Sequence, residues 1–144
     1  MDRVRLTVGL KQGCPLSPLL FSLYVSDVDY VAEGCEGAMT GTENFCVSHL
    51  MFADNLTLLS NCVGDLQKML DKLRGYAERK HLIINVSKSE VVHFNSRGEQ
   101  PKLKVGSAVL QCKDSFKYLG MMFYKTLNME RSSEYVNGAI MAAS

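Results

Sequence analysis

Residues 45–60 read FCVSHLMFADNLTLLS and contain two apolar runs of the kind that favours β-strands. The runs cover residues 45–53 and 56–60, and only Asp54 and Asn55 separate them. Both of these residue types tolerate a left-handed backbone, so a two-residue link of this composition suits a tight hairpin. We therefore predict a β-hairpin that presents a carboxylate and an amide at its turn.

Helical patterns lie on both sides of this hairpin. Ser17 and Pro18 precede a series of apolar residues as an N-cap and a first-turn proline, which predicts an amphipathic helix that stops near Gly34. Apolar residues then recur at intervals of three and four and predict a second helix over about residues 64–80. Further strands are expected over residues 82–86, 91–94, 103–110 and 116–123, a turn region over residues 37–42, and a short helix from about residue 129.

The order helix, hairpin, helix and strands predicts an α+β fold, with an antiparallel sheet covered on one face by helices. The 144 residues suit one domain, and 47% hydrophobic with 22% charged residues excludes disordered, collagenous and coiled-coil proteins. No apolar run reaches about 18 residues, and the first ten residues lack the apolar core of a signal peptide. We therefore expect an intracellular protein, in nucleus or cytoplasm, that does not associate with membranes.

The cysteines do not predict a metal site or a disulfide framework. There are five of them, an odd number, and no pair has C-x-x-C spacing. Cys46 and His49 form one C-x-x-H pattern, but no second ligand pair follows it and the two positions lie on a predicted strand.

Charge is divided unevenly along the chain, although the net charge is +1. Residues 13–66 hold seven acids and no Lys or Arg, net −7, whereas residues 67–104 hold nine bases and four acids, net +5. One interpretation is a cation-binding site beside a surface for a polyanion. The other is two ordinary solvated faces.

Four blocks of sequence resemble, in order, motifs of the non-LTR (LINE-type) retrotransposon reverse transcriptases. Residues 9–21 (GLKQGCPLSPLLF) look like motif B, and residues 52–55 (FADN) look like motif C, whose usual form is aromatic-Ala-Asp-Asp at a hairpin turn. Residues 82–90 (LIINVSKSE) resemble motif D, and residues 116–120 (FKYLG) resemble the primer-grip hairpin. Each block alone is weak, but the ordered set is specific and extends over most of the chain.

The resemblance implies a polymerase palm that acts on an RNA template and a DNA primer. In such enzymes two Mg²⁺ ions about 3.5 to 4 Å apart, with Mn²⁺ as a substitute, assist nucleotidyl transfer. Carboxylate oxygens are the ligands that Mg²⁺ prefers, so Asp54 is the expected catalytic metal ligand, with Asn55 beside it. The alternative for Asp54 is an ordinary hairpin-turn aspartate.

Other roles also come from the resemblance. Lys88 corresponds to the motif D lysine thought to protonate or stabilise the leaving pyrophosphate, although a solvated loop lysine is equally consistent with the sequence. Gln12 and Gly13 correspond to positions beside the incoming nucleotide and template. Phe52 and Ala53 are also expected to bind the nucleotide or template. The residues expected to line the primer are Tyr118, Leu119 and Gly120.

Two departures from the family pattern affect the expected activity. Motif A, which supplies an essential aspartate upstream of motif B, has no counterpart, because Asp2 is the only acid before Gly9. Asn55 replaces the usual second aspartate and removes a negative charge. We therefore expect one partial domain, palm over residues 1–124 and the start of a thumb over residues 125–144, without motif A, fingers or most of the thumb.

Such a chain is expected to be inactive as a polymerase. The alternative is a non-catalytic nucleic-acid-binding or structural remnant of a retrotransposon that uses the basic segment 67–104 on phosphates. The absent motif A strand would leave a sheet edge unpaired, which favours self-association.

Overall fold

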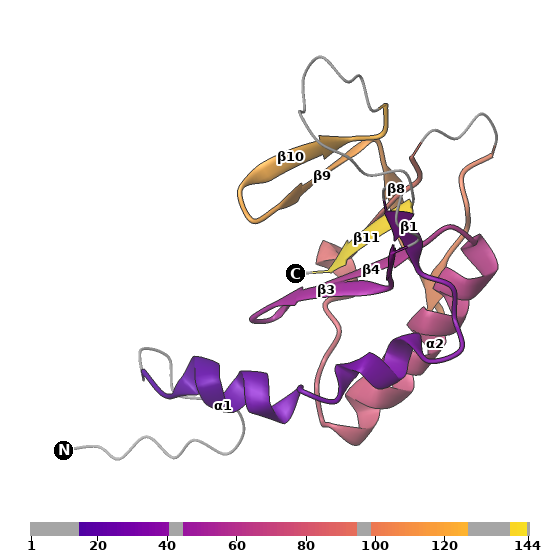
Figure 1. Cartoon of the computed structure of the whole chain (residues 1–144). Coiled ribbons are helices and arrows are strands. Elements are labelled where there is room, and N and C mark those ends of the chain that lie inside the picture. Colours follow the sequence, from indigo (N-terminus) through magenta and orange to yellow (C-terminus); the bar gives the residue numbers. More distant parts are fainter. Residues whose placement is uncertain (1–14, 41–44, 95–98, 127–138, 144) are drawn as a thin grey trace.

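The computed structural model describes residues 15–40, 45–94, 99–126 and 139–143 (Figure 1). A five-stranded sheet with strand order β3-β4-β11-β5-β8 lies at its centre, and three two-stranded antiparallel sheets accompany it. The elements are α1 (Ser17–Tyr24), η1 (Val28–Ala32), β1 (Ala38–Thr40), β2 (Phe45–Val47), β3 (His49–Phe52), β4 (Asn55–Ser60), α2 (Val63–Arg79), η2 (Val86–Lys88), β5 (Glu90–Val92), β6 (Lys104–Val105), β7 (Ala108–Val109), β8 (Gln111–Lys113), β9 (Ser115–Tyr118), β10 (Met121–Tyr124) and β11 (Ala139–Ala143).

The predicted mixture of helices and antiparallel strands is confirmed, with one difference. Neighbouring strands of the central sheet run antiparallel except β5 and β8, which pair in parallel. The helix α2 packs against the sheet and contacts β4 (Figure 1). No helix among the described residues is long and apolar enough to cross a membrane.

The apolar stripe predicted for the second helix forms the main core. Helix α2 buries it against Leu58 of β4, Val91 of β5 and Leu103. Adjacent residues of a strand face opposite sides of the sheet, so Leu59 and Val92 contribute to a second cluster on the other face. The stripe consists of Leu66, Met69, Leu70, Leu73, Tyr76 and Ala77.

The predicted hairpin forms, but its turn is shifted by one residue. Phe52 pairs with Asn55, so Ala53 and Asp54 are the turn residues and Asn55 begins β4. The prediction that Asp54 and Asn55 form the link was therefore wrong. Ala53 has the left-handed backbone, with φ of 52°, and the strand pairing that reaches Asn55 imposes this conformation.

The predicted first helix is broken into two parts. Helix α1 ends at Tyr24, turns follow over residues 25–27, and the 3-10 helix η1 comes next. Leu16 is the N-cap in place of Ser17, while Pro18 lies in the first turn as predicted. Three valines, Val25, Val28 and Val31, become buried after the break, whereas α1 buries none of its residues. Tertiary packing of these β-branched side chains thus overrides a continuous helix.

Several predicted strands are also divided. The run over residues 45–53 is interrupted at Ser48, because β2 pairs with β1 in the expected turn region and β3 pairs with β4. Residues 103–110 form the β6–β7 hairpin around Gly106, and residues 116–123 belong to the β9–β10 hairpin.

Two further predictions of secondary structure were wrong, one in the block that resembles motif D and one in the C-terminal tail. Residues 82–85 form no strand, and the short η2 follows them. The tail was expected to be helical from about residue 129, but its described part is β11, which inserts between β4 and β5. Residues 129–138 lie outside the described residues.

Candidate functional site

A cavity of about 360 Å³ brings together residues from four parts of the chain. Its walls come from residues 21–28, the second half of α2, the β3–β4 hairpin and residues 82–88. The lining is mainly apolar, and its charged residues are Asp54 and Lys88. A largely apolar cavity with a few polar groups at defined places is the usual form of a small-ligand site.

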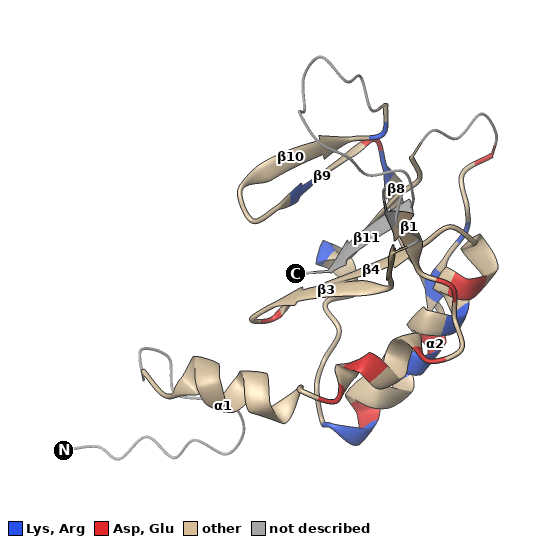
Figure 2. Ribbon diagram, viewed as in Figure 1, with Lys and Arg blue, Asp and Glu red and all other residues tan. Residues whose placement is uncertain are grey.

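Asp54 owes its place in the cavity to the tight turn. It is exposed, and its carboxylate has no hydrogen bond or ion pair with another described residue. The β3–β4 turn therefore has an acidic tip (Figure 2). A free carboxylate on a rigid hairpin can act as an oxygen ligand for a hard cation.

Lys88 is held at the wall of the cavity by a local turn around Asn85. The Lys88 backbone N–H donates to the Asn85 carbonyl over 3.1 Å, and the Ser89 hydroxyl donates to the same carbonyl over 2.9 Å. The Ser87 hydroxyl donates to the Asn85 side-chain oxygen over 2.7 Å. These bonds fix η2, so the exposed Lys88 side chain borders the cavity and supplies a positive charge.

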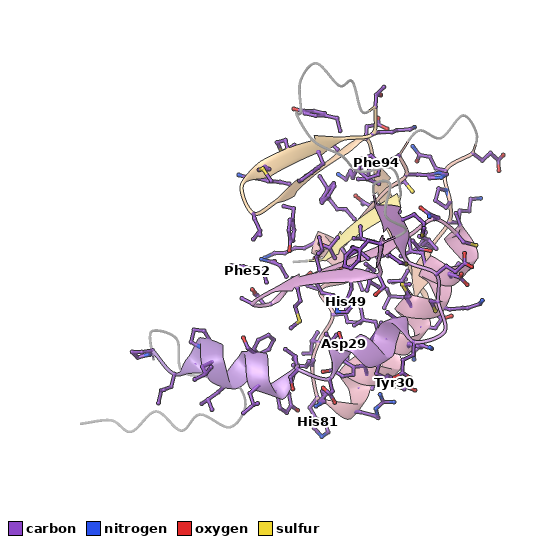
Figure 3. All side chains as sticks on the ribbon, viewed as in Figure 1. Asp29, Tyr30, His49, Phe52, His81 and Phe94 are labelled. Atoms are coloured by element: carbon purple, nitrogen blue, oxygen red, sulfur yellow. The ribbon has the colours of Figure 1, made fainter. Side chains whose placement is uncertain are left out.

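The other predicted residues of the hairpin are Phe52, Ala53 and Asn55, and they differ in whether they line the cavity. Ala53 lines the cavity beside Asp54, whereas Phe52 is 59% exposed and is not part of the lining. Figure 3 shows Phe52 at the β3–β4 turn. Asn55, the first residue of β4, also lies outside the lining. Gln12 and Gly13 fall outside the described residues.

The predicted primer-grip residues form a separate feature, the β9–β10 hairpin. Leu119 and Gly120 make its turn, with φ of 48° and 89°. The hairpin is attached through Phe116, whose ring stacks on Phe123 with centroids 5.0 Å apart and meets Phe94 edge-on at 6.3 Å. Tyr118 packs against this aromatic cluster, and none of the three predicted residues lines the cavity.

The donor set of the cavity does not complete a Mg²⁺ site. Mg²⁺ requires near-octahedral oxygen coordination and usually one or two carboxylates with water and phosphate. Asp54 is the one carboxylate of the cavity, and within residues 15–40, 45–94, 99–126 and 139–143 no group of three or more His, Cys, Asp or Glu could hold a metal ion. His49, of the C-x-x-H pattern, contacts Asp29 instead, with Nε2 3.0 Å from Oδ1 (Figure 3).

The sequence analysis did not identify Tyr76 as a residue of the cavity, nor Asp27 as its hydrogen-bond partner. Tyr76 lies on the apolar stripe of α2, lines the cavity and donates its hydroxyl to Asp27 over 2.7 Å. Burial, together with this hydrogen bond, raises the pKa of Tyr76 far above its usual range. The hydrogen bonds from Tyr76 and Lys80 lower the pKa of Asp27. Because the hydroxyl of a buried tyrosine usually needs a hydrogen-bond partner, a tyrosine on the core-facing stripe of α2 could have indicated such a polar contact.

The basic segment does not form a continuous positive surface on α2. Lys and Arg alternate with Asp and Glu along this helix (Figure 2). Among the described residues of the segment, three bases make ion pairs: Lys68 with Asp65, Arg74 with Glu78 and Lys80 with Asp27, at 2.7, 3.0 and 3.0 Å. This pairing favours the interpretation of a solvated face.

Comparison with known proteins identifies the family. Residues 2–123 match the sequence profile described as reverse transcriptase (RNA-dependent DNA polymerase), so the chain belongs to this family. Its resemblance to the non-LTR retrotransposon enzymes is confirmed by curated relatives. No solved structure matches the chain.

Three of these relatives come from insect mobile elements. The RNA-directed DNA polymerase from mobile element jockey of Drosophila funebris is 28% identical over 85% of the chain and 14% of its own length. The Pol polyprotein from the R2DM element of Drosophila melanogaster is 34% identical over 82% of the chain and 12% of its own length. That from the R2 element of Nasonia vitripennis is 28% identical over 83% and 13%. The chain thus spans about an eighth of their length.

Proposed function

We propose that residues 1–144 form part of the palm and the start of the thumb of an RNA-directed DNA polymerase from a non-LTR retrotransposon, and that the cavity lined by Asp54 and Lys88 receives a nucleotide. The observation that carries this proposal is the presence of both residues in one cavity. They come from the second and third motif-like blocks, which the fold brings together. The Lys88 ammonium group suits the phosphates of such a ligand and the apolar lining suits its base, whereas the Asp54 carboxylate suits a cation that accompanies the phosphates.

The other predicted residues take their proposed roles from the family. Gln12, Gly13, Phe52 and Ala53 would contact the nucleotide and the RNA template, and Asn55 would assist Asp54. The turn of the β9–β10 hairpin would contact the DNA primer through Tyr118, Leu119 and Gly120. We place the palm at residues 1–124 and the start of the thumb at residues 125–144.

We also propose that residues 1–144 by themselves do not polymerise nucleotides. The support is the donor set, in which Asp54 is the one carboxylate among the described residues that line the cavity. The test is primer extension on an RNA template with Mg²⁺ and with Mn²⁺, and the expected result is no extended product. DNA synthesis that is lost in Asp54→Ala would contradict this part of the proposal.

A second candidate function is non-catalytic binding of nucleic acid through the basic segment. Lys72 and Arg79 favour it, because neither forms an ion pair with a carboxylate of the described residues and both lie over the Tyr30 ring. It predicts duplex binding that weakens with salt at a log-log slope of about −0.9 per phosphate contacted. Absence of binding at low salt would eliminate this candidate.

A further inference from the structure

Helix α1 is attached to the rest of the molecule in an unusual way. None of its side chains is buried, and Leu19, Leu20 and Leu23 are each at least half exposed. In Figure 1 the helix extends away from the sheet, beyond the end of α2. Apolar burial is what normally fixes the position of a helix, so α1 needs another source of support.

Polar contacts with the end of α2 provide that support. The Tyr24 hydroxyl donates to the Lys80 carbonyl over 2.6 Å, and the Lys80 ammonium donates back to the Tyr24 carbonyl over 2.9 Å. The same ammonium lies 4.9 Å from the centroid of the Tyr24 ring. These reciprocal contacts join residues that are 56 positions apart in the sequence.

Asp27 extends the contact to the turn that follows α1. Its Oδ1 accepts from the Tyr76 hydroxyl over 2.7 Å and lies 3.0 Å from the Lys80 Nζ. Lys80 therefore bridges both ends of the junction between α1 and η1. We call Tyr24, Asp27, Tyr76 and Lys80 the clasp.

The clasp lies beside the cavity that holds Asp54. Phe21 of α1 lines this cavity, and so do Tyr76 and the two valines on either side of Asp27, Val25 and Val28. Any movement of α1 about residues 25–27 would move Phe21 relative to Asp54.

We propose that the clasp residues are positioning residues, which hold α1 against α2 and thereby fix the Phe21 wall of the cavity. The effect of the clasp on nucleotide binding rests on the proposed function of the cavity. Burial of Val25, Val28 and Val31 keeps η1 in place without the clasp, with exposures of 3%, 6% and 1%. Loss of the clasp is therefore expected to release α1 and leave the core folded.

The chain contains no tryptophan, so Phe21→Trp supplies a single fluorescent reporter in the cavity wall. In this background we would measure acrylamide quenching for Asp27→Asn and Tyr76→Phe. Each change removes a contact to a charged group and is expected to raise the population with a released α1 about tenfold, so quenching increases. The midpoint of urea unfolding, followed by circular dichroism, monitors the core separately.

Matched variants distinguish a release of α1 from a general loss of stability of the fold. Tyr30→Phe removes a hydroxyl from an exposed tyrosine outside the clasp and should leave quenching unchanged. Lys80→Arg keeps a donor and a charge and should resemble the parent, whereas Lys80→Met should resemble Asp27→Asn. Because Asp27 is exposed, Asp27→Asn gives a result even if Tyr76→Phe does not fold.

Quenching that is the same in Asp27→Asn, Lys80→Met and the parent would overturn the proposal. The tryptophan signal does not depend on any ligand, so the proposed function is assessed independently by deoxynucleoside triphosphate binding. Quenching that rises in a chain that binds no triphosphate would uphold the clasp and reject the nucleotide site.

Discussion

At the scale of single residues, buried leucines and exposed leucines should respond very differently to truncation. Leu70 of α2 is fully buried in the main core, whereas Leu19 of α1 is 67% exposed. We expect Leu70→Ala to lower the free energy of unfolding by about 2–5 kcal/mol, because it leaves a cavity in packed surroundings. Leu19→Ala, the matched control, should change it by less than about 0.5 kcal/mol. Urea unfolding measures both, and equal effects would contradict the packing described for α2.

Two aspartates should make stability depend on acidic pH. The pKa of Asp27 is lowered mainly by the hydrogen bond from Tyr76, and that of Asp65 mainly by the one from Lys68. A lowered pKa in the folded state means that the unfolded chain takes up protons first as the pH falls. The resulting stabilisation is present above the unfolded value of 3.8 and is lost as the pH falls through the folded values.

The measurement is urea unfolding across this acidic range. Asp27→Asn should show a smaller loss of stability with falling pH than the parent chain, because the titrating carboxylate is gone. Asp114→Asn removes a carboxylate from the exposed turn between β8 and β9 and serves as the control of equal charge. A parent-like pH profile in Asp27→Asn would contradict the assigned hydrogen bonds.

At the scale of elements, the β6–β7 hairpin depends on a glycine. Gly106 has φ of +62°, and a Cβ there would lie 2.9 Å from the Arg74 Nη1. We expect Gly106→Ala to lower the free energy of unfolding by about 1–2 kcal/mol, chiefly through the left-handed backbone. Gly75, inside α2, has open space where an alanine methyl group would lie. Gly75→Ala should therefore raise the free energy of unfolding by about 0.5–1 kcal/mol.

Thermal or urea unfolding of the two glycine variants provides the comparison. Arg74→Ala combined with Gly106→Ala should recover only a small part of the loss, since the end of an arginine side chain moves easily. A full recovery would mean that steric contact, and not backbone conformation, determines the need for glycine.

The elements also show where sequence patterns succeed and fail. The second helix was predicted within a residue at each end, because six apolar positions of one stripe all face the core. The first helix was not, since burial of Val28 and Val31 depends on their contact with α2 and not on local preference. The hairpin was predicted correctly, but its turn moved to Ala53 and Asp54 because strand pairing reaches Asn55.

At the scale of the whole molecule, topology was the least predictable feature. Strand β11 lies between β4 and β5, although both partners precede it by many residues. No local pattern in the sequence encodes such a long-range pairing. Of the residues that line the cavity, the motif resemblance selected Asp54 and Lys88, but it assigned no role to Phe21 or Tyr76.

Asp54 and Lys88 are proposed to border a nucleotide site, and titration calorimetry with a deoxynucleoside triphosphate tests this proposal most directly. We expect the chain of residues 1–144 to bind the triphosphate and Lys88→Ala to bind it about tenfold more weakly, through loss of a charged contact to phosphate. Lys102→Ala, which removes an exposed lysine outside the cavity, should bind like the parent. No binding by the parent, or equal affinities of Lys88→Ala and Lys102→Ala, would contradict the claim.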